Sequence, residues 1–455
     1  MTRSWIRRWL NPGPSWWRRG RAVALGAALM ALAGCAAPTV SDSGAPAQPA
    51  PPPAPVAAPA EPSVAPPAPV AVETAPPAEV RVGLLLPLSG DNTPLGQALL
   101  RAAQMALFEA APDDFALIVR DTGGSDEVAE RAARDAIAAG AQLLLGPVFA
   151  GSVRAVTPAA RAAGINVIAF STDRKVAGDG VFVMGLLPSV QVERIVGYAY
   201  AQGLRRFAAL APDTPYGRTV VEALQGAASR AGGAVVAVEY YDPAAADVAP
   251  AVRRLARYEA RSATLTAQRE ALAGGQDQAS QEALTRLGQY AAVGELGFDA
   301  VLLAEGGDRL RAVAPLLPYY DIDPAAVRFL GTALFAEPGL GTEPALVGSW
   351  FAAPAQAAWD AFAARYRAAY GAAPPRLAGL AYDATALAAA LASRFGGADF
   401  SVDALIRPSG FAGVDGIFRF RPDGTVERGL AVFELQRGGL LALDPAPDIF
   451  GELLY

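Results

Sequence analysis

Short apolar runs that alternate with helix-like stretches are the feature that most constrains the fold of this chain. The run at 80–86, Val-Arg-Val-Gly-Leu-Leu-Leu, is typical of a strand buried on both faces, and a helical stretch follows it. The alternation predicts strands at 80–86, 116–120, 142–145, 166–170, 206–210, 234–240 and 298–303, and helices at 96–110, 125–139, 152–163, 190–202 and 217–231. Strands that alternate with helices of this length indicate βαβ units. We therefore expect an α/β fold built on parallel sheets that helices cover.

The part of the chain that carries this pattern, residues 80–455, is too long for one ordinary hydrophobic core. Single cores rarely grow beyond about 250–300 residues, so we expect two α/β lobes. Residues 250–292 lack strand signals and are rich in alanine, glutamine and arginine, which predicts one or two exposed helices inserted into the domain. Near the end, alternating apolar residues flank Asp423-Gly424 and predict a hairpin that pairs 416–420 with 430–435.

The segment before Val80 has the layout of a secretory signal. Six arginines precede a short apolar stretch at 22–33, which leads into Leu32-Ala33-Gly34-Cys35 with the only cysteine of the chain. This run resembles the lipobox of bacterial lipoproteins. The resemblance implies that residues 1–34 are a signal peptide and that Cys35 carries the lipid. It also implies an anchor on the periplasmic face of the outer membrane, because Ala36 is not the aspartate associated with inner-membrane retention.

Two other interpretations of this segment are an uncleaved membrane span and an incidental buried thiol. A span needs about 20 consecutive apolar residues, and the alanine-rich stretch at 22–33 is shorter. Residues 36–79 contain 14 prolines and offer Cys35 no core in which to be buried. Such a composition does not bury enough apolar surface to fold. We expect residues 35–79 to be a disordered tether that reaches on the order of 100 Å when extended.

Composition excludes several classes of function. The chain has no histidine, and Lys175 is its only lysine. A zinc site of the common kind and a Ser-His-Asp triad therefore cannot be assembled, and we expect a non-catalytic protein with neither metal nor cofactor.

The net charge of the chain bears on its partners. Loss of residues 1–34 would remove six of the 38 basic residues and leave 32 against 44 acidic ones, a net charge near −12. Such a charge disfavours nucleic acid as a partner, because phosphate binding needs clustered Lys and Arg.

Five segments, in this order along the chain, resemble motifs of the type I periplasmic binding proteins, which have the two-lobed Venus-flytrap fold. They are VGLLLPLSG at 82–90, LGPVFAGS at 145–152, GINVIAFS at 164–171, DTPYG at 213–217 and AYDA at 381–384. The resemblance covers about residues 80–445. It implies that each lobe is discontinuous, since the family's chain crosses between lobes three times. We expect lobe 1 at about 80–186 and 330–405, and lobe 2 at about 187–329 and 406–445.

The family's ligands lie in the cleft outside the carboxyl ends of the strands, where helix N-termini favour carboxylates. The matching loops place six candidate ligand residues there: Ser89, Ser152, Ser171, Thr172, Tyr216 and Glu305. Each has an alternative role. Serine or threonine after a strand is often a helix N-cap, Tyr216 could serve packing, and Glu305 could be a solvated charge.

Two functions within the family fit the chain. The branched-chain amino-acid receptors of ABC transporters hold the ligand's carboxylate with hydroxyl groups of lobe 1 and its ammonium with an acidic residue of lobe 2. This chain departs from them at Phe149-Ala150-Gly151, where those receptors are serine-rich, and at Asp173, near an expected threonine. The penicillin-binding protein activators are outer-membrane lipoproteins with the same fold that stimulate a peptidoglycan synthase. The best-known activator also has an N-terminal helical repeat domain, whose place the tether takes here.

The lipobox, the tether and the insertion favour the second group. We therefore predict an outer-membrane lipoprotein that binds and activates a penicillin-binding protein, with a small amino-acid-like ligand as a further partner. The alternative is the substrate-binding lipoprotein of a branched-chain amino-acid ABC transporter. A sensory or scaffolding flytrap without a small ligand is a third class.

Overall fold

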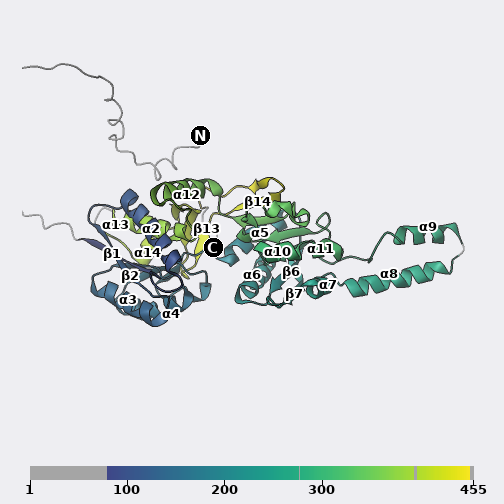
Figure 1. The fold of residues 1–455 in the computed structure, drawn as a ribbon, viewed down its shortest axis with the longest axis horizontal. Helices are drawn as coiled ribbons and strands as arrows, with labels where there is room; N and C mark the ends of the chain where they lie inside the picture. The colour runs from purple at the N-terminus through teal and green to yellow at the C-terminus, as the bar shows by residue number, and fades with distance from the viewer. Residues whose placement is uncertain (1–78, 276, 394–396, 451–455) are drawn as a thin grey trace, which may run out of the picture. The chain divides into compact units, whose positions relative to one another are not determined.

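The computed structural model describes residues 79–275, 277–393 and 397–450, which form a two-lobed α/β fold (Figure 1). The predicted signal peptide, the lipidated Cys35 and nearly all of the predicted tether lie outside the described residues. No helix in the described part of the chain is both long and apolar enough to cross a membrane.

Lobe 1 contains a five-stranded parallel sheet with the strand order β2-β1-β3-β4-β5. Its strands are β1 (Val80–Leu86), β2 (Phe115–Asp121), β3 (Leu143–Leu145), β4 (Asn166–Ala169) and β5 (Val181–Val183). Its helices are α2 (Thr93–Ala110), α3 (Asp126–Ala138), α4 (Ala150–Ala162), α12 (Gln356–Tyr370), α13 (Ala378–Ala392) and α14 (Val402–Leu405). The prediction of a parallel α/β fold is confirmed: every residue of β1 except Arg81 is buried, as expected for a strand covered on both faces.

Local signals explain where these helices lie. The hydroxyl of Ser125 accepts a hydrogen bond from the backbone N–H of Val128 and caps α3, as predicted. Helix α13 comes from a distant part of the sequence and packs against α2. Nearly all of α13 is buried, and its alanines allow this close approach. The hydroxyl of Tyr366 on α12 donates to the carbonyl of Ala98 on α2, which joins a third helix to this pair.

Lobe 2 contains a seven-stranded mixed sheet with the order β15-β14-β10-β9-β8-β6-β7. Its strands are β6 (Arg206–Pro212), β7 (Ala234–Tyr241), β8 (Ala300–Leu303), β9 (Arg328–Gly331), β10 (Trp350–Ala353), β14 (Ala431–Gln436) and β15 (Gly439–Asp444). Helices α5 (Pro188–Ala201) and α6 (Pro215–Ala231) pack against each other, and α10 (Gly307–Val313) and α11 (Leu316–Tyr319) complete the lobe. Strands β14 and β15 run antiparallel to their neighbours.

The expected lobe boundaries differ from those of the structure. Residues 330–353, expected in lobe 1, contain most of β9 and all of β10 of the second sheet, where β10 pairs with β9 and β14. Residues 411–428, expected in lobe 2, pack on the core of lobe 1 through Phe411, Phe418, Phe420 and Val426. The chain therefore passes between the two sheets after β5, after β10 and after β13, the three crossings that were expected.

The predicted terminal hairpin is correct in its turn and wrong in its second strand. Strand β12 (Gly416–Phe420) pairs with β11 (Phe411–Gly413) and with β13 (Val426–Arg428) in a three-stranded sheet. The apolar residues at 431–435, expected to pair with β12, instead form β14 of the second sheet. Strand β13 ends after Arg428, and the chain then crosses to the other lobe.

Gly424, in the turn between β12 and β13, lies against the edge of the first sheet. Its carbonyl accepts a hydrogen bond of 2.8 Å from the N–H of Val183. Its φ is +78°, and a Cβ on Gly424 would lie 2.3 Å from the carbonyl oxygen of Val181. Only glycine fits this position without displacement of the backbone.

We therefore expect Gly424→Ala to lower the free energy of unfolding by about 2 kcal/mol or more, because strain at positive φ adds to a backbone clash. Guanidinium unfolding of the full chain measures the change. Gly438→Ala is the matched control: nothing lies within 4 Å of its added Cβ, and it should change stability by less than about 0.5 kcal/mol. Equal effects of the two substitutions would contradict the packing described for this turn.

The predicted helical insertion is present. It consists of α7 (Ala249–Leu255), α8 (Tyr258–Ala273) and α9 (Gln278–Leu287), and α8 and α9 lie side by side away from the second sheet (Figure 1). The guanidinium of Arg269 on α8 donates to the carbonyls of Leu287 and Tyr290, at 2.6 and 3.0 Å. Among the residues described on α8 and α9, Leu265 alone is buried. We refer to residues 258–287, which form these two helices and the turn between them, as the helical arm.

Candidate functional site

The loop after β1 is held in place by Asp121, the last residue of β2. One carboxylate oxygen of Asp121 accepts hydrogen bonds from the backbone N–H groups of Leu88, Ser89 and Gly123, at 2.8, 3.2 and 2.8 Å. Burial raises the pKa of Asp121, but the Ser89 hydroxyl and these backbone groups outweigh it and hold the pKa below its ordinary value. The structure thus places Ser89 at the carboxyl edge of the first sheet, exposed and beside a fixed negative charge.

The start of α4 lies at the same edge, after β3. Ser152, in the first turn of α4, is 1 % exposed, and its hydroxyl donates to a carboxylate oxygen of Asp126 at 3.3 Å. Asp126 is the first residue of α3, which packs against α4. A Cβ on Gly151 would lie 2.6 Å from both carboxylate oxygens of Asp126. The carboxylate of Asp126 therefore lies directly against the first turn of α4.

The loop after β4 carries the next two candidates. Ser171 is buried, and its hydroxyl accepts a hydrogen bond of 3.1 Å from the N–H of Asp173. Thr172 is exposed. The carboxylate of Asp173 accepts a hydrogen bond from the N–H of Lys175 at 3.0 Å and lies 3.7 Å from the guanidinium of Arg154 on α4. Ser171 therefore forms a hydrogen bond within its own loop, whereas the side chain of Thr172 faces solvent.

Tyr216 lies at the carboxyl edge of the second sheet, at the start of α6. Its hydroxyl is 2.9 Å from the hydroxyl of Thr332, which follows β9. Burial raises the pKa of Tyr216; the hydrogen bond with Thr332 opposes the shift, and the nearby carboxylate of Glu305 adds to it. Thr332 itself is 1 % exposed. This pair brings together two segments that are 116 residues apart in the sequence.

Glu305, which follows β8, is half-buried beside Tyr241 and Arg309. Burial raises the pKa of Glu305, and Tyr241 and Arg309 act in the opposite direction. The guanidinium of Arg309 lies 5.5 Å from the centre of the Tyr241 ring and donates to the carbonyl of Ala245. We define the lobe 2 cluster as Tyr216, Tyr241, Glu305, Arg309 and Thr332.

The structure groups the six candidates at the carboxyl edges of two different sheets. Ser89, Ser152, Ser171 and Thr172 belong to lobe 1, and Tyr216 and Glu305 to lobe 2. Sequence reasoning missed Asp121, Asp126, Tyr241, Arg309 and Thr332, which contact these candidates. No described group of three or more acidic, histidine or cysteine side chains is placed to hold a metal ion.

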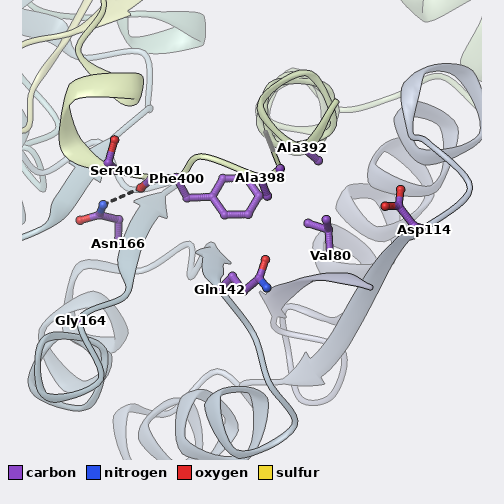
Figure 2. A pocket seen from close by; sticks show the side chains of 10 residues that line it. Val80, Asp114, Gln142, Gly164, Asn166, Ala392, Ala398, Phe400 and Ser401 are labelled. Carbon is purple, nitrogen blue, oxygen red and sulfur yellow. Dashed lines mark hydrogen bonds between the residues drawn. The ribbon is translucent and has the colours of Figure 1, made fainter. Parts of the chain in front are cut away.

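A hollow of about 480 Å³ lies elsewhere in lobe 1 (Figure 2). It is lined at the amino ends of the strands by Val80, Asp114, Gln142 and Asn166, and on the other side by Phe400 and Ser401. The side-chain amide of Asn166 donates to the carbonyl of Phe400 at 2.8 Å, the contact drawn in Figure 2. This hollow is at the opposite edge of the sheet from the candidate residues.

Two α/β lobes joined by three crossings, with polar side chains at the carboxyl edges of their sheets, define the class of flytrap binding proteins. The chain belongs to the periplasmic binding protein family: residues 79–439 match the family model of that description. The expected resemblance to type I periplasmic binding proteins is confirmed.

Solved structures show the same fold. A putative branched-chain amino acid ABC transporter protein from Rhodospirillum rubrum has a TM-score of 0.62 and 20% identity, over 80% of this chain and 99% of that one. A solute binding protein from Rhodopseudomonas palustris BisB5, in complex with 3,4-dihydroxybenzoic acid, has a TM-score of 0.54 and 16% identity, over 81% and 98%. The substrate binding protein LivJ from Streptococcus pneumoniae, in complex with isoleucine, has a TM-score of 0.52 and 18% identity, over 81% and 99%.

The uncharacterized protein RP748 of Rickettsia prowazekii is similar to this chain in sequence. It is 28% identical to this chain over 178 residues, which are 39% of this chain. The match spans about half (47%) of the length of that relative.

Proposed function

We propose that this chain is the substrate-binding protein of an ABC transporter and that it holds a small ligand at the carboxyl edges of its two sheets. The proposal is supported by membership of the periplasmic binding protein family and by the likeness to transporter binding proteins, two of them in complex with isoleucine or 3,4-dihydroxybenzoic acid. The lobe 2 cluster carries the proposal. A half-buried carboxylate beside two tyrosines and an arginine is typical of a small-molecule site.

Calorimetry of the full chain with a ligand panel tests the proposal. The panel contains leucine, isoleucine, valine, leucinamide and 3,4-dihydroxybenzoate. At least one member should bind, and Glu305→Gln should weaken that binding by about tenfold or more, the loss expected for a hydrogen bond to a charged group. Glu295→Gln is the matched control, because the side chain of Glu295 is 89% exposed. Binding that both variants retain in full would exclude the lobe 2 cluster as the site.

The pKa of Glu305 predicts how binding depends on pH. A cationic group of the ligand is attracted only by the ionised carboxylate, and burial raises the pKa of Glu305 above its ordinary value. Affinity for a cationic ligand should therefore fall as the pH decreases, and this loss should begin at a higher pH than for an ordinary glutamate. Calorimetry from neutral to acidic pH measures this, with Glu305→Gln as the variant whose residual binding should not follow the same curve.

The predicted activation of a penicillin-binding protein remains a second candidate, which the helical arm favours. Its two helices contact each other and leave most of their side chains exposed, so the arm offers a surface that the core of lobe 2 does not use. The lipid on Cys35 would anchor the chain to the outer membrane, and the tether would let this surface extend away from that membrane. The glycan polymerisation rate of a purified penicillin-binding protein should rise with the full chain and not with a variant in which a short linker replaces 258–287.

The lipid anchor has its own test. Cys35→Ser should move the protein from the membrane fraction to the released fraction, because the acyl chains on Cys35 supply the attachment. Immunoblotting of fractionated cells measures this change. Retention of the Cys35→Ser protein in the outer membrane would contradict the anchor.

A further inference from the structure

Two of the three crossings between the lobes are joined where they leave lobe 1. Met184 directly follows β5 and opens the first crossing, and Arg428 is the last residue before the third. The guanidinium of Arg428 donates to the carbonyl of Met184 at 2.6 Å, across 244 positions of the sequence. The third crossing consists of Gly429 and Leu430, since β14 begins at the next residue. Because a hinge is a few residues whose backbone angles change, this hydrogen bond lies at the hinge between the lobes.

A buried ionic cluster surrounds this hydrogen bond. Asp383 on α13 and Asp415 in the turn between β11 and β12 are buried, and both carboxyl groups act on the guanidinium of Arg428. The guanidinium of Arg376 lies 2.6 Å from Asp415 and 4.3 Å from the ring centre of Trp359 on α12, the helix that follows the second crossing. The cluster therefore reaches all three crossings. We define the hinge cluster as Asp383, Asp415, Arg376 and Arg428.

The carboxyl group of Asp383 is packed tightly in this cluster. Its Oδ1 accepts the N–H of Val414 at 2.8 Å, and its Oδ2 has no hydrogen-bond partner among the residues that the structure describes. A Cβ on Gly413 would lie 2.3 Å from Oδ2, so the backbone closes directly over the carboxyl group. Burial and the charge of Asp415 raise the pKa of Asp383 to about 8.

The other charged and titratable groups near Asp383 come from the elements packed around it. Those that interact with it directly are Asp415, Arg428 and its neighbour Tyr382. On the far side of Tyr382, the carboxylate of Glu109 on α2 and the guanidinium of Arg365 on α12 both contact the tyrosine hydroxyl and pair with each other at 3.3 Å. The arginines keep their charge over the whole pH range considered.

The first crossing also contacts the loop after β4. A Cβ on Gly185, which follows Met184, would lie 2.1 Å from the carbonyl oxygen of Ser171. A displacement of Met184 is therefore passed on to the loop that carries the candidate ligand residues Ser171 and Thr172.

We propose that the hinge cluster is a proton-sensitive clasp, which holds the crossings together while Asp383 is protonated and loosens when Asp383 ionises. The direction follows from linkage. Ionisation of Asp383 is costly in the packed cluster and ordinary in a conformer that admits water, so the loosened conformer gains population as the pH rises towards about 8. Once loosened, the crossings that Arg428 joins can change their backbone angles, and the lobes take up a wider range of relative positions. The clasp goes beyond the proposed function and does not depend on any ligand.

Distances between labelled sites on the two lobes test the clasp. Asp135→Cys on α3 and Glu222→Cys on α6, both at exposed positions, are introduced into the full chain with Cys35→Ser, and a nitroxide is attached to each new cysteine. Pulsed electron paramagnetic resonance should give a broader distance distribution at pH 9 than at pH 6. Asp383→Asn, whose amide does not ionise, should give the pH 6 distribution at both pH values.

Asp403→Asn is the matched control, because Asp403 is exposed on α14, and it should keep the full pH response. Near-UV circular dichroism follows the packing of each labelled protein at both pH values. An equal distribution at pH 6 and pH 9 in the protein with native Asp383, or a broadening that Asp383→Asn retains, would overturn the clasp. Broadening that coincides with loss of the near-UV signal would overturn it too, since the change would then be unfolding.

The part played by Arg428 is tested in the variant that combines Arg428→Met with Asp383→Asn and Asp415→Asn. This variant lacks the donor to Met184 and leaves no buried acid of the cluster unpaired. Its distance distribution should already be broad at pH 6 and should not change with pH. A distribution as narrow as that of the protein with the native cluster at pH 6 would contradict the role of Arg428 in joining the crossings.

Discussion

Replacing Arg428 with methionine should lower the free energy of unfolding by about 3–5 kcal/mol, the usual cost of removing one partner from a buried ionic group. Arg428 is the last residue of β13 and is 6% exposed. Its guanidinium donates to the carbonyl of Met184 at 2.6 Å, and the buried carboxylates of Asp383 and Asp415 surround it. Without Arg428, the carbonyl of Met184 would lose this donor, and Arg376, which lies 2.6 Å from Asp415, would be the remaining cation beside the two buried acids.

Guanidinium unfolding followed by tryptophan fluorescence measures this change. Arg437→Met is the matched control, since Arg437 is exposed in the turn before β15, and it should cost less than about 0.5 kcal/mol. Combining Arg428→Met with Asp383→Asn and Asp415→Asn should restore much of the loss, because it removes both ionisable groups that Arg428 faces. A single Arg428→Met variant as stable as the control would show that these charges do not depend on Arg428.

The stability of the protein should fall as the pH rises from about 6 to 8, by up to about 1.4 kcal/mol for each pH unit, the slope for one proton. Burial, with the charge of Asp415 beside it, raises the pKa of Asp383 to about 8. A carboxyl with a raised pKa in the folded state stabilises the fold below its unfolded pKa of 3.8. That stability is lost as the pH rises through about 8.

The chain has no histidine, so no imidazole contributes to the pH dependence of stability in this range. Asp383→Asn should flatten the slope, since its amide cannot ionise. It keeps the acceptor that takes the N–H of Val414 at 2.8 Å. Unfolding curves at several pH values compare the two proteins. An unchanged slope in Asp383→Asn would assign the titration to another group.

The elements with strong local signals could be predicted from the sequence. The apolar run at β1 and the Ser125 cap of α3 each specify their element within a few residues. Strand β5 was missed because only three residues, Val181–Val183, form it. The lobe assignment of 411–428 failed for another reason. Both β13 and β14 follow the Asp-Gly turn, and only packing decides which of them pairs with β12.

The candidate site could be predicted only in part. Tyr216 and Glu305 follow recognisable strands, so their edge of the sheet was evident. Thr332 follows β9 and Tyr216 follows β6, and the two residues meet because one strand, β8, lies between β9 and β6 in the sheet. No local sequence pattern reveals this strand order. Asp126 resembles any acidic residue in the first turn of a helix. Its effect on α4 arises only because α3 and α4 pack side by side and bring its carboxylate to Gly151.

The three crossings mean that neither lobe is complete until almost the whole chain has been made. Lobe 1 needs α13 against α2 and β13 near its edge, while lobe 2 needs β14 between β10 and β15. The contacts of Tyr366 with Ala98 and of Tyr382 with Glu109 join residues 268 and 273 positions apart. Such long-range contacts slow folding and leave apolar surface exposed meanwhile. A nascent chain that stops before α13 begins at Ala378 therefore has two unfinished cores, whose exposed apolar surfaces favour aggregation.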